Sequence, residues 1–127
     1  MQEEMQFTIE GRLPSLNEYT RACRAHWSKG AKLKQQVEAE IMWQITQARL
    51  AKKLAPVTEP VVISLEWHEK NRRRDFDNVT FGVKFILDAL QRMDILINDD
   101  SKHVVGINHS IVHDGQSFIV VTIRPAA

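Results

Sequence analysis

A single cysteine, Cys23, is present among the 127 residues, which excludes a disulfide framework and any zinc site built on several cysteines. The five histidines include no HExxH motif of the kind that is typical of zinc enzymes. No apolar run approaches the roughly 20 residues of a membrane-spanning helix, so no membrane partner is expected. The first residues also lack the basic and apolar regions of a signal peptide, and we therefore expect a cytoplasmic protein.

The sequence also lacks a strong excess of either charge, since its formal net charge is only +1. Toward a polyanionic partner, this balance predicts modest non-specific affinity with a strong dependence on salt. The basic residues are nevertheless unevenly placed. Against a single acid, Glu18, the segment 12–34 holds six basic residues: Arg12, Arg21, Arg24, Lys29, Lys32 and Lys34. Residues 70–74 add four more without an acid, so two basic segments are available to an anionic partner.

Length and hydrophobic periodicity predict one α/β (α+β) domain over residues 1–127. The predicted order is β-α-β-α-β-β, a small mixed sheet of about four strands packed by two main helices. Strands are expected over 5–9, 61–67, 104–113 and 118–123, and helices over 28–54 and 78–93. Residues 13–32 have no regular period and are expected to be irregular. Asp114 and Gly115 are typical of a hairpin turn, which predicts that the last two strands pair with each other.

The most informative stretch is residues 72–78, which reads RRRDFDN. In an extended segment, Asp75 and Asp77 would point to the same side. Two carboxylates so close repel each other unless a cation lies between them, and hard oxygen ligands select magnesium, manganese or calcium. The three arginines before them are suited to hold phosphate. The combination indicates metal-dependent chemistry on a phosphodiester.

Each feature of this pattern also has a purely structural interpretation. Asp77 stands where a helix N-cap is expected. An arginine run beside acids is often a solvated loop with weak ion pairs. Asn98 to Ser101, with Asp99 and Asp100 between them, is typical of a turn.

Together, three motifs resemble the RusA family of Holliday junction resolvases, which are endodeoxyribonucleases typical of phages and prophages. The motifs are RRRDFDN at 72–78, KFILDAL at 84–90 and NDDS at 98–101. The early segment LPSLNEY, at 13–19, is similar to the Pro/Asn/Tyr loop of the family. The resemblance extends over nearly the whole chain.

The resemblance implies a homodimer that cuts branched DNA, in particular four-way junctions, by two symmetric nicks. It implies Mg²⁺ as the cofactor, with Mn²⁺ as a substitute and no organic cofactor. The metal ligands would be Asp75, Asp77 and Asp100, with Asp99 as the alternative if the register slips by one. The segments suited to DNA contact contain Arg72, Arg73, Arg74, Lys70, Asn17, Tyr19, Arg21, Arg24 and Lys29, and the early segment adds His26 and Trp27 as candidate ligand contacts.

The catalytic lysine that the resemblance implies has no direct counterpart, because Phe81 occupies the position four residues after Asp77. The nearest lysine is Lys84, which keeps the family's spacing to the following Asp-Ala-Leu. On one continuous helix, positions four and seven residues after a reference lie on nearly the same face. We therefore expect Lys84 to take the catalytic role; the alternative is an ion pair with Asp88.

The position of Asp100 raises a geometric question. A helix over 78–93 is roughly 24 Å long, so Asp100 reaches its start only if residues 94–100 return almost fully extended. Alternatively the helix is shorter, with Gly82 as the weak point, or Asp100 serves the site of the other subunit. We expect the return within one chain.

Three other functions fit some of these residues. A nuclease for flaps or other branched phage DNA would use the same site. A non-catalytic DNA-binding module would use the basic loop, with the acids as caps and turns. A phosphohydrolase of small substrates is disfavoured, because such a ligand does not need the long basic segment at 12–34.

Overall fold

The computed structural model describes residues 3–127. Eight elements follow one another: β1 (Met5–Glu10), α1 (Leu16–Ala25), α2 (Trp27–Leu50), β2 (Val61–Glu69), α3 (Phe76–Thr80), α4 (Val83–Arg92), β3 (Val104–His113) and β4 (Phe118–Pro125). The four strands form one mixed sheet in the order β1-β4-β2-β3, which confirms the predicted fold class. β4 runs antiparallel to β1 and β2, whereas β3 runs parallel to β2.

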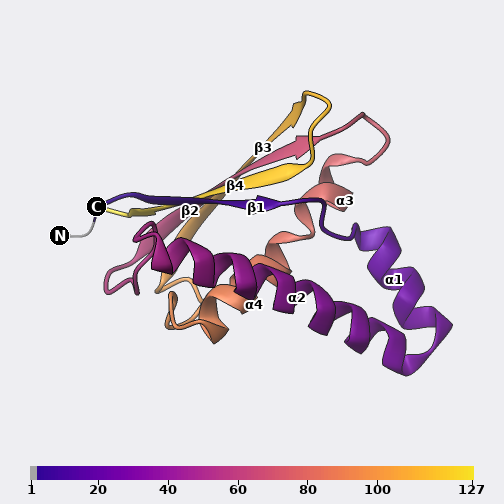
Figure 1. The fold of residues 1–127 in the computed structure, drawn as a ribbon, viewed down its shortest axis with the longest axis horizontal. Helices are drawn as coiled ribbons and strands as arrows, with labels where there is room; N and C mark the ends of the chain where they lie inside the picture. The colour runs from indigo at the N-terminus through magenta and orange to yellow at the C-terminus, as the bar shows by residue number, and fades with distance from the viewer. Residues whose placement is uncertain (1–2) are drawn as a thin grey trace.

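Side-chain alternation along β2 divides the sheet into a covered and an open face. Ile63, Leu65 and Trp67 are buried, whereas the intervening Ser64 and Glu66 are half-buried. Helices α2 and α4 lie against the covered face and pack together beneath the strands (Figure 1). Strictly alternating burial is what a sheet with one solvated face requires. None of the helices in residues 3–127 combines the length and the apolar character needed to cross a bilayer.

The prediction that the last two strands pair with each other as a hairpin is wrong. A turn does form at the predicted place, since Gly115 has a φ of +79° and Asp114 Oδ1 accepts a hydrogen bond from the Gln116 backbone N–H at 3.1 Å. However, β2 lies between β3 and β4, so the two strands are not neighbours. The turn residues specify only a local reversal, while β2 takes a strand on each of its edges, β3 on one and β4 on the other.

The helix expected over 78–93 is interrupted at Phe81 and Gly82, which separate α3 from α4. Gly82 lies so close to its neighbours that an added Cβ would be 3.0 Å from Leu13 Cδ1 and 3.2 Å from Trp67 Cη2. The prediction of Gly82 as the weak point is therefore confirmed. Close packing against β2 accompanies the break.

A helix, α1, occupies half of the segment 13–32 that was expected to be irregular, and the start of α2 occupies residues 27–32. Its start carries a capping box, because Ser15 Oγ accepts from the Glu18 N–H at 3.1 Å while Glu18 Oε1 accepts from the Ser15 N–H at 3.3 Å. The pattern Ser-x-x-Glu was present in the sequence as a helix-start signal. α1 packs against α2, which begins at Trp27 and ends at Leu50, four residues earlier than expected.

Candidate active site and nucleic-acid interface

Asp75 and Asp77 lie just beyond the end of β2, at the start of α3. Asp75 is the N-cap residue of this helix, with φ −70° and ψ 161°, yet its side chain makes no capping hydrogen bond. Asp77 lies in the first turn, where its Oδ1 accepts from the Asn78 N–H at 3.1 Å. The cap position expected for Asp77 thus belongs to Asp75, and the pair begins a helix instead of lying in an extended strand.

Both carboxylates are exposed, and neither forms an ion pair with any residue in the described range 3–127. Two neighbouring anions without a cation partner are electrostatically unfavourable. This arrangement fits carboxylates whose partner is supplied from outside the chain.

The arginine run before these acids divides into two groups. Arg74 is largely buried, and its Nε and Nη2 donate to the two carboxylate oxygens of Glu69 at 2.9 and 2.8 Å. Its Nη1 donates to the Leu13 carbonyl at 2.9 Å. Because its guanidinium is occupied by protein acceptors, Arg74 is not included in the proposed DNA contacts. Arg72 and Arg73 are exposed, and within residues 3–127 neither makes an ion pair.

The start of α1 lies beside the two acids. The Asn17 backbone N–H donates to Asn78 Oδ1 at 3.1 Å, which connects α1 to α3. Tyr19, expected to contact DNA, is only half exposed and packs its ring against Phe81 and Phe85 at centroid distances of 5.6 and 5.7 Å. Burial raises the pKa of Tyr19. Its position is that of an aromatic bridge between α1 and the helices that follow the acids.

Asp100 does not return to the other two aspartates, so the expectation of a site within one chain is wrong. In the parallel pair, Val61 at the start of β2 lies opposite Val104, and its N–H donates to the His103 carbonyl at 2.9 Å. Asp75 follows the other end of β2, and nine strand residues span about 26 Å. The segment before β3 and helix α3 accordingly lie at opposite ends of the sheet (Figure 1).

Parallel pairing of β2 and β3 explains this separation. A strand parallel to β2 must begin at the end where β2 begins, and the connection through α3 and α4 carries the chain back to that end. Accordingly, residues 3–127 of one chain contain no group of three or more His, Cys, Asp or Glu side chains placed to hold a metal ion.

The segment around Asp100 forms the turn that its composition predicts. Asp100 Oδ1 accepts from the Lys102 and His103 N–H groups, each at 3.1 Å, and lies 2.6 Å from His103 Nδ1. The hydrogen bond from His103 holds the pKa of Asp100 below its ordinary value. Asn98 Oδ1 accepts from the N–H groups of Asp99 and Asp100 at 2.7 and 3.2 Å. Both aspartates remain exposed.

Lys84 is an exposed residue in the first turn of α4. The break at Gly82 means that Lys84 and Asp77 do not share one continuous helix. Helical spacing therefore does not place Lys84 on the same face as the position four residues after Asp77. The alternative ion pair with Asp88 is also not formed, since Asp88 Oδ2 instead lies 3.4 Å from Lys34 Nζ. The side chain of Lys84 has no ion-pair partner among the described residues, and its catalytic role stays a prediction.

His109, on β3, contacts Phe76, the residue between the two acids, and the sequence did not indicate this contact. The Trp67 Nε1–H donates to His109 Nδ1 at 2.9 Å, which leaves the ring proton on Nε2. The ring of Phe76, the residue between the two aspartates, meets His109 edge-on at a centroid distance of 6.3 Å. Burial lowers the pKa of His109, so a neutral imidazole supports the first residue of α3. The sequence did carry a signal for this position: His109 lies two residues from both Ile107 and Ile111, so the three side chains point to the same side of β3.

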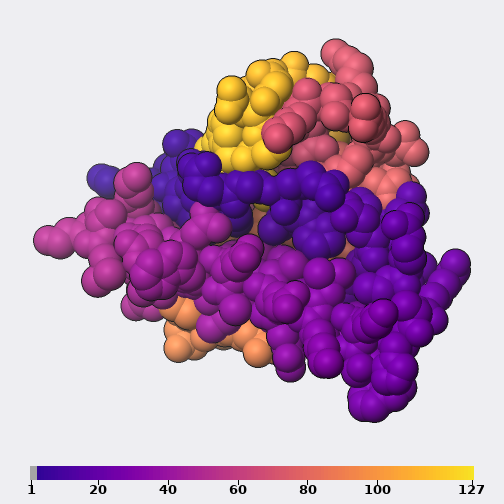
Figure 2. Space-filling model, turned by 45° about the vertical axis from the view of Figure 1, so that its right-hand side comes forward, coloured from indigo at the N-terminus to yellow at the C-terminus, as the bar shows by residue number. Residues whose placement is uncertain are grey.

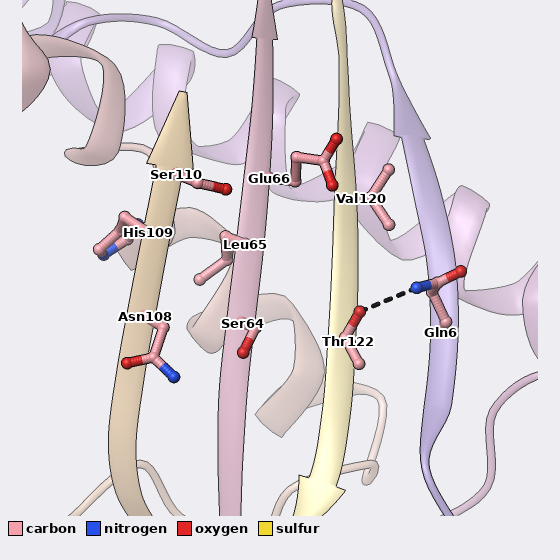
Figure 3. A pocket seen from close by; sticks show the side chains of 9 residues that line it. All are labelled: Gln6, Ser64, Leu65, Glu66, Asn108, His109, Ser110, Val120 and Thr122. Atoms are coloured by element: carbon pink, nitrogen blue, oxygen red, sulfur yellow. Dashed lines mark hydrogen bonds between the residues drawn. The ribbon is translucent and has the colours of Figure 1, made fainter. Parts of the chain in front are cut away.

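The open face of the sheet carries a separate polar hollow (Figure 3). Its side chains come from all four strands, and Gln6 Nε2 donates to Thr122 Oγ1 across it at 3.0 Å. Glu66 at its rim pairs with His68, which in turn pairs with Asp114. None of the predicted acids lines this hollow, so it is not the proposed catalytic centre.

Comparison with known families gives a match to the model described as "Endodeoxyribonuclease RusA" over residues 10–124. The matched region extends from the last residue of β1 to the penultimate residue of β4, and it includes α3 with its two acids and the turn at Asp100. A search of curated proteins found no match to the chain.

Proposed function

Because the chain belongs to the RusA family of endodeoxyribonucleases, we propose that it resolves four-way DNA junctions in recombination and repair. It would act in the cytoplasm, cutting two strands symmetrically with a divalent metal ion. The observation that carries this proposal is the exposed, unpaired couple Asp75 and Asp77, with the free guanidinium groups of Arg72 and Arg73 directly before it.

The donor set fits a hard cation. Carboxylate oxygens are the preferred ligands of Mg²⁺ and Mn²⁺, and no protein cation competes for Asp75 or Asp77 among residues 3–127. When bound, such an ion lowers the pKa of a coordinated water and offsets charge on the scissile phosphate.

The remaining residues of the site act on the DNA itself. Arg72, Arg73 and Lys70 are exposed beside the acids and would hold phosphates on either side of the cut, which positions the strand without reading its sequence. Lys84 would balance the charge that develops on the phosphate. The two hydrogen bonds from Arg74 to the Glu69 carboxylate, here called the clamp, would hold the loop between β2 and α3 in place while these contacts form.

We further propose that Asp100 completes the site of the partner subunit. β3 is an edge strand, and its side chains Val105 and Ile107 are 50% and 38% exposed. An unpaired edge is suited to pair with a second copy. If two β3 strands pair antiparallel across a twofold axis, the turn at Asp100 of one subunit comes beside α3 of the other. Such a dimer has two equivalent sites for two symmetric nicks.

The first experiment is a cleavage assay on a synthetic four-way junction, a flap, a fork and a linear duplex, each with and without Mg²⁺. We expect metal-dependent cleavage of the four-way junction. Cleavage confined to the flap or fork would support the branched-DNA nuclease instead, and junction binding without any cleavage would support the binding module.

Asp75→Asn and Asp77→Asn should each abolish cleavage but leave junction binding intact or stronger, because less negative charge faces the DNA. Wild-type turnover by both variants would contradict the proposal that Asp75 and Asp77 hold the metal ion.

A mixing experiment tests the shared site. In a heterodimer of Asp75→Asn and Asp100→Asn subunits, shared sites place both substitutions in one site and leave the other site intact. We expect each variant alone to be inactive and the mixture to nick one strand without the paired second cut. Asp99→Asn is the matched control and should stay active. A mixture as inactive as its components would contradict the shared site.

A further inference from the structure

The turn between α1 and α2 is a defined elbow at the end of the molecule. His26, with φ −165° and ψ 143°, ends α1 and caps α2: its Nδ1 accepts from the Ser28 N–H at 3.2 Å and lies 2.8 Å from Ser28 Oγ. Gly30 allows the two helices to touch, because an added Cβ would collide with Cys23 Sγ. The elbow projects away from the sheet, at the lower right of both views (Figures 1 and 2).

Trp27 stands at this elbow with 84% of its surface exposed, compared with 1% for Trp67 in the core. The ring contact that the structure gives it is with His26, at a centroid distance of 5.5 Å and an interplanar angle of 32°. A large apolar ring held in solvent on a rigid turn contributes little to the core of its own chain. Its exposure is instead suited to a flat ligand that stacks on its free face.

The charges around Trp27 indicate the chemistry of that ligand. Arg21 and Arg24 are exposed and lie at i+4 and i+7 from Asn17, so the three share one face of α1. Lys29 follows on α2 and is also exposed. Within the described residues, none of these three basic side chains forms an ion pair, whereas Arg12, Arg74 and Lys34 all do.

This unpaired basic face connects the elbow to the acids. α1 begins beside α3 through the hydrogen bond from Asn17 to Asn78 and extends for about 14 Å to the elbow. A strand bound at Asp75 can therefore continue along the face of α1 to Trp27. Uncompensated cations together with an aromatic platform are the recurring features of sites that bind unpaired nucleic acid strands.

We propose that Trp27 stacks on an unstacked base at the branch point of the DNA, and thereby gives the protein its preference for branched over linear DNA. This inference rests on the proposed function, because it takes junction DNA as the substrate. Continuous duplex offers no free base face, so the stack forms only where pairing is interrupted. Loss of one base–aromatic stack weakens binding by about tenfold.

Binding measurements in EDTA test the stack without any cleavage. The probe is a four-way junction with 2-aminopurine at the branch point, compared with a linear duplex of the same arm sequence. We expect Trp27→Ala to weaken junction binding about tenfold and duplex binding less than about twofold. Trp27→Phe should recover most of the affinity. Trp43→Ala is the matched control, because Trp43 is also exposed (64%) but lies beside Glu40 instead of unpaired basic residues.

Fluorescence identifies the ring that contacts the base. Two of the three tryptophans, Trp27 and Trp43, are exposed, whereas Trp67 is buried. Junction DNA should quench emission of the wild type and of Trp43→Phe, but not of Trp27→Phe. Equal junction affinity of Trp27→Ala and Trp43→Ala would overturn the inference. So would an equal loss on duplex and junction, or a change in oligomeric state caused by Trp27→Ala.

The outcomes also separate this inference from the proposed function. Normal stacking in a protein that cleaves nothing with Mg²⁺ would count against the nuclease proposal alone. Metal-dependent junction cleavage with unaltered binding by Trp27→Ala would count against the stack alone.

Discussion

Arginines that are adjacent in the sequence lie in different environments in the fold. Arg74 is held by the buried carboxylate of Glu69, while Arg72 and Arg73 project into solvent beside Asp75. The difference follows from where each side chain points as the chain leaves β2. Only a side chain directed back toward the sheet reaches Glu69.

This division predicts that two alanine substitutions differ strongly in their effect on stability. Arg74→Ala leaves the Glu69 carboxylate buried without its partner, and we expect the free energy of unfolding in urea to fall by about 3 kcal/mol. Arg73→Ala should change it by less than about 0.5 kcal/mol.

Replacing Arg72 and Arg73 together should flatten the slope of log affinity against log salt by about one to two units, on junction and duplex alike. An unchanged slope would return these arginines to a structural role.

His109 predicts a pH dependence of stability. Burial lowers its pKa in the folded protein below the ordinary value of 6.5, so the unfolded chain binds more protons in the interval below pH 6.5. Its contribution to stability is therefore fully present above pH 6.5 and decreases as the pH falls from there toward the lowered pKa. In urea unfolding from pH 7.5 to 5, we expect His109→Gln to remove part of the decrease. Parallel curves for both proteins would contradict this.

The helical hairpin α1–α2 depends on one close contact. Gly30→Ala places a methyl group against Cys23 Sγ, and overpacking of this kind costs about 1–3 kcal/mol. The double variant Cys23→Ala with Gly30→Ala removes the opposing sulfur and should recover most of the lost stability. The single variant Cys23→Ala serves as the control for the cycle. Equal losses in Gly30→Ala and in the double variant would mean that the contact with Cys23 is not the cause.

The proposed shared site requires that the edge strand β3 pair with a second copy of the chain. Lysines at Val105 and Ile107 add charge to an exposed strand edge, a change that opposes edge pairing. By light scattering we expect this double variant to become monomeric and to lose junction cleavage. Leu50→Lys, at a 75% exposed position on α2, should remain dimeric. If Leu50→Lys dissociates the dimer instead, the interface lies on the exposed face of α2, and the proposed pairing of two β3 strands is contradicted.

Local patterns in the sequence were sufficient for most elements and for part of the proposed site. Alternation predicted most of β2, β3 occupies the residues that were predicted for it, and the period of apolar residues predicted most of α2. The pair Asp75 and Asp77 was identifiable because both residues lie in one short motif. The start of α1 was also encoded locally, in the capping box of Ser15 and Glu18, although the segment was interpreted as irregular.

Contacts between distant segments could not be inferred in this way. The clamp from Arg74 to Glu69 and the hydrogen bond from Trp67 to His109 depend on the direction of side chains and on which strands become neighbours. The order β1-β4-β2-β3 likewise decides that β3 and β4 do not pair, although a good turn joins them. It also places Asp100 at the far end of β2 from Asp75. Residues 75 and 100 are close in sequence, but strand direction is a property of the whole sheet, so only the tertiary structure separates them.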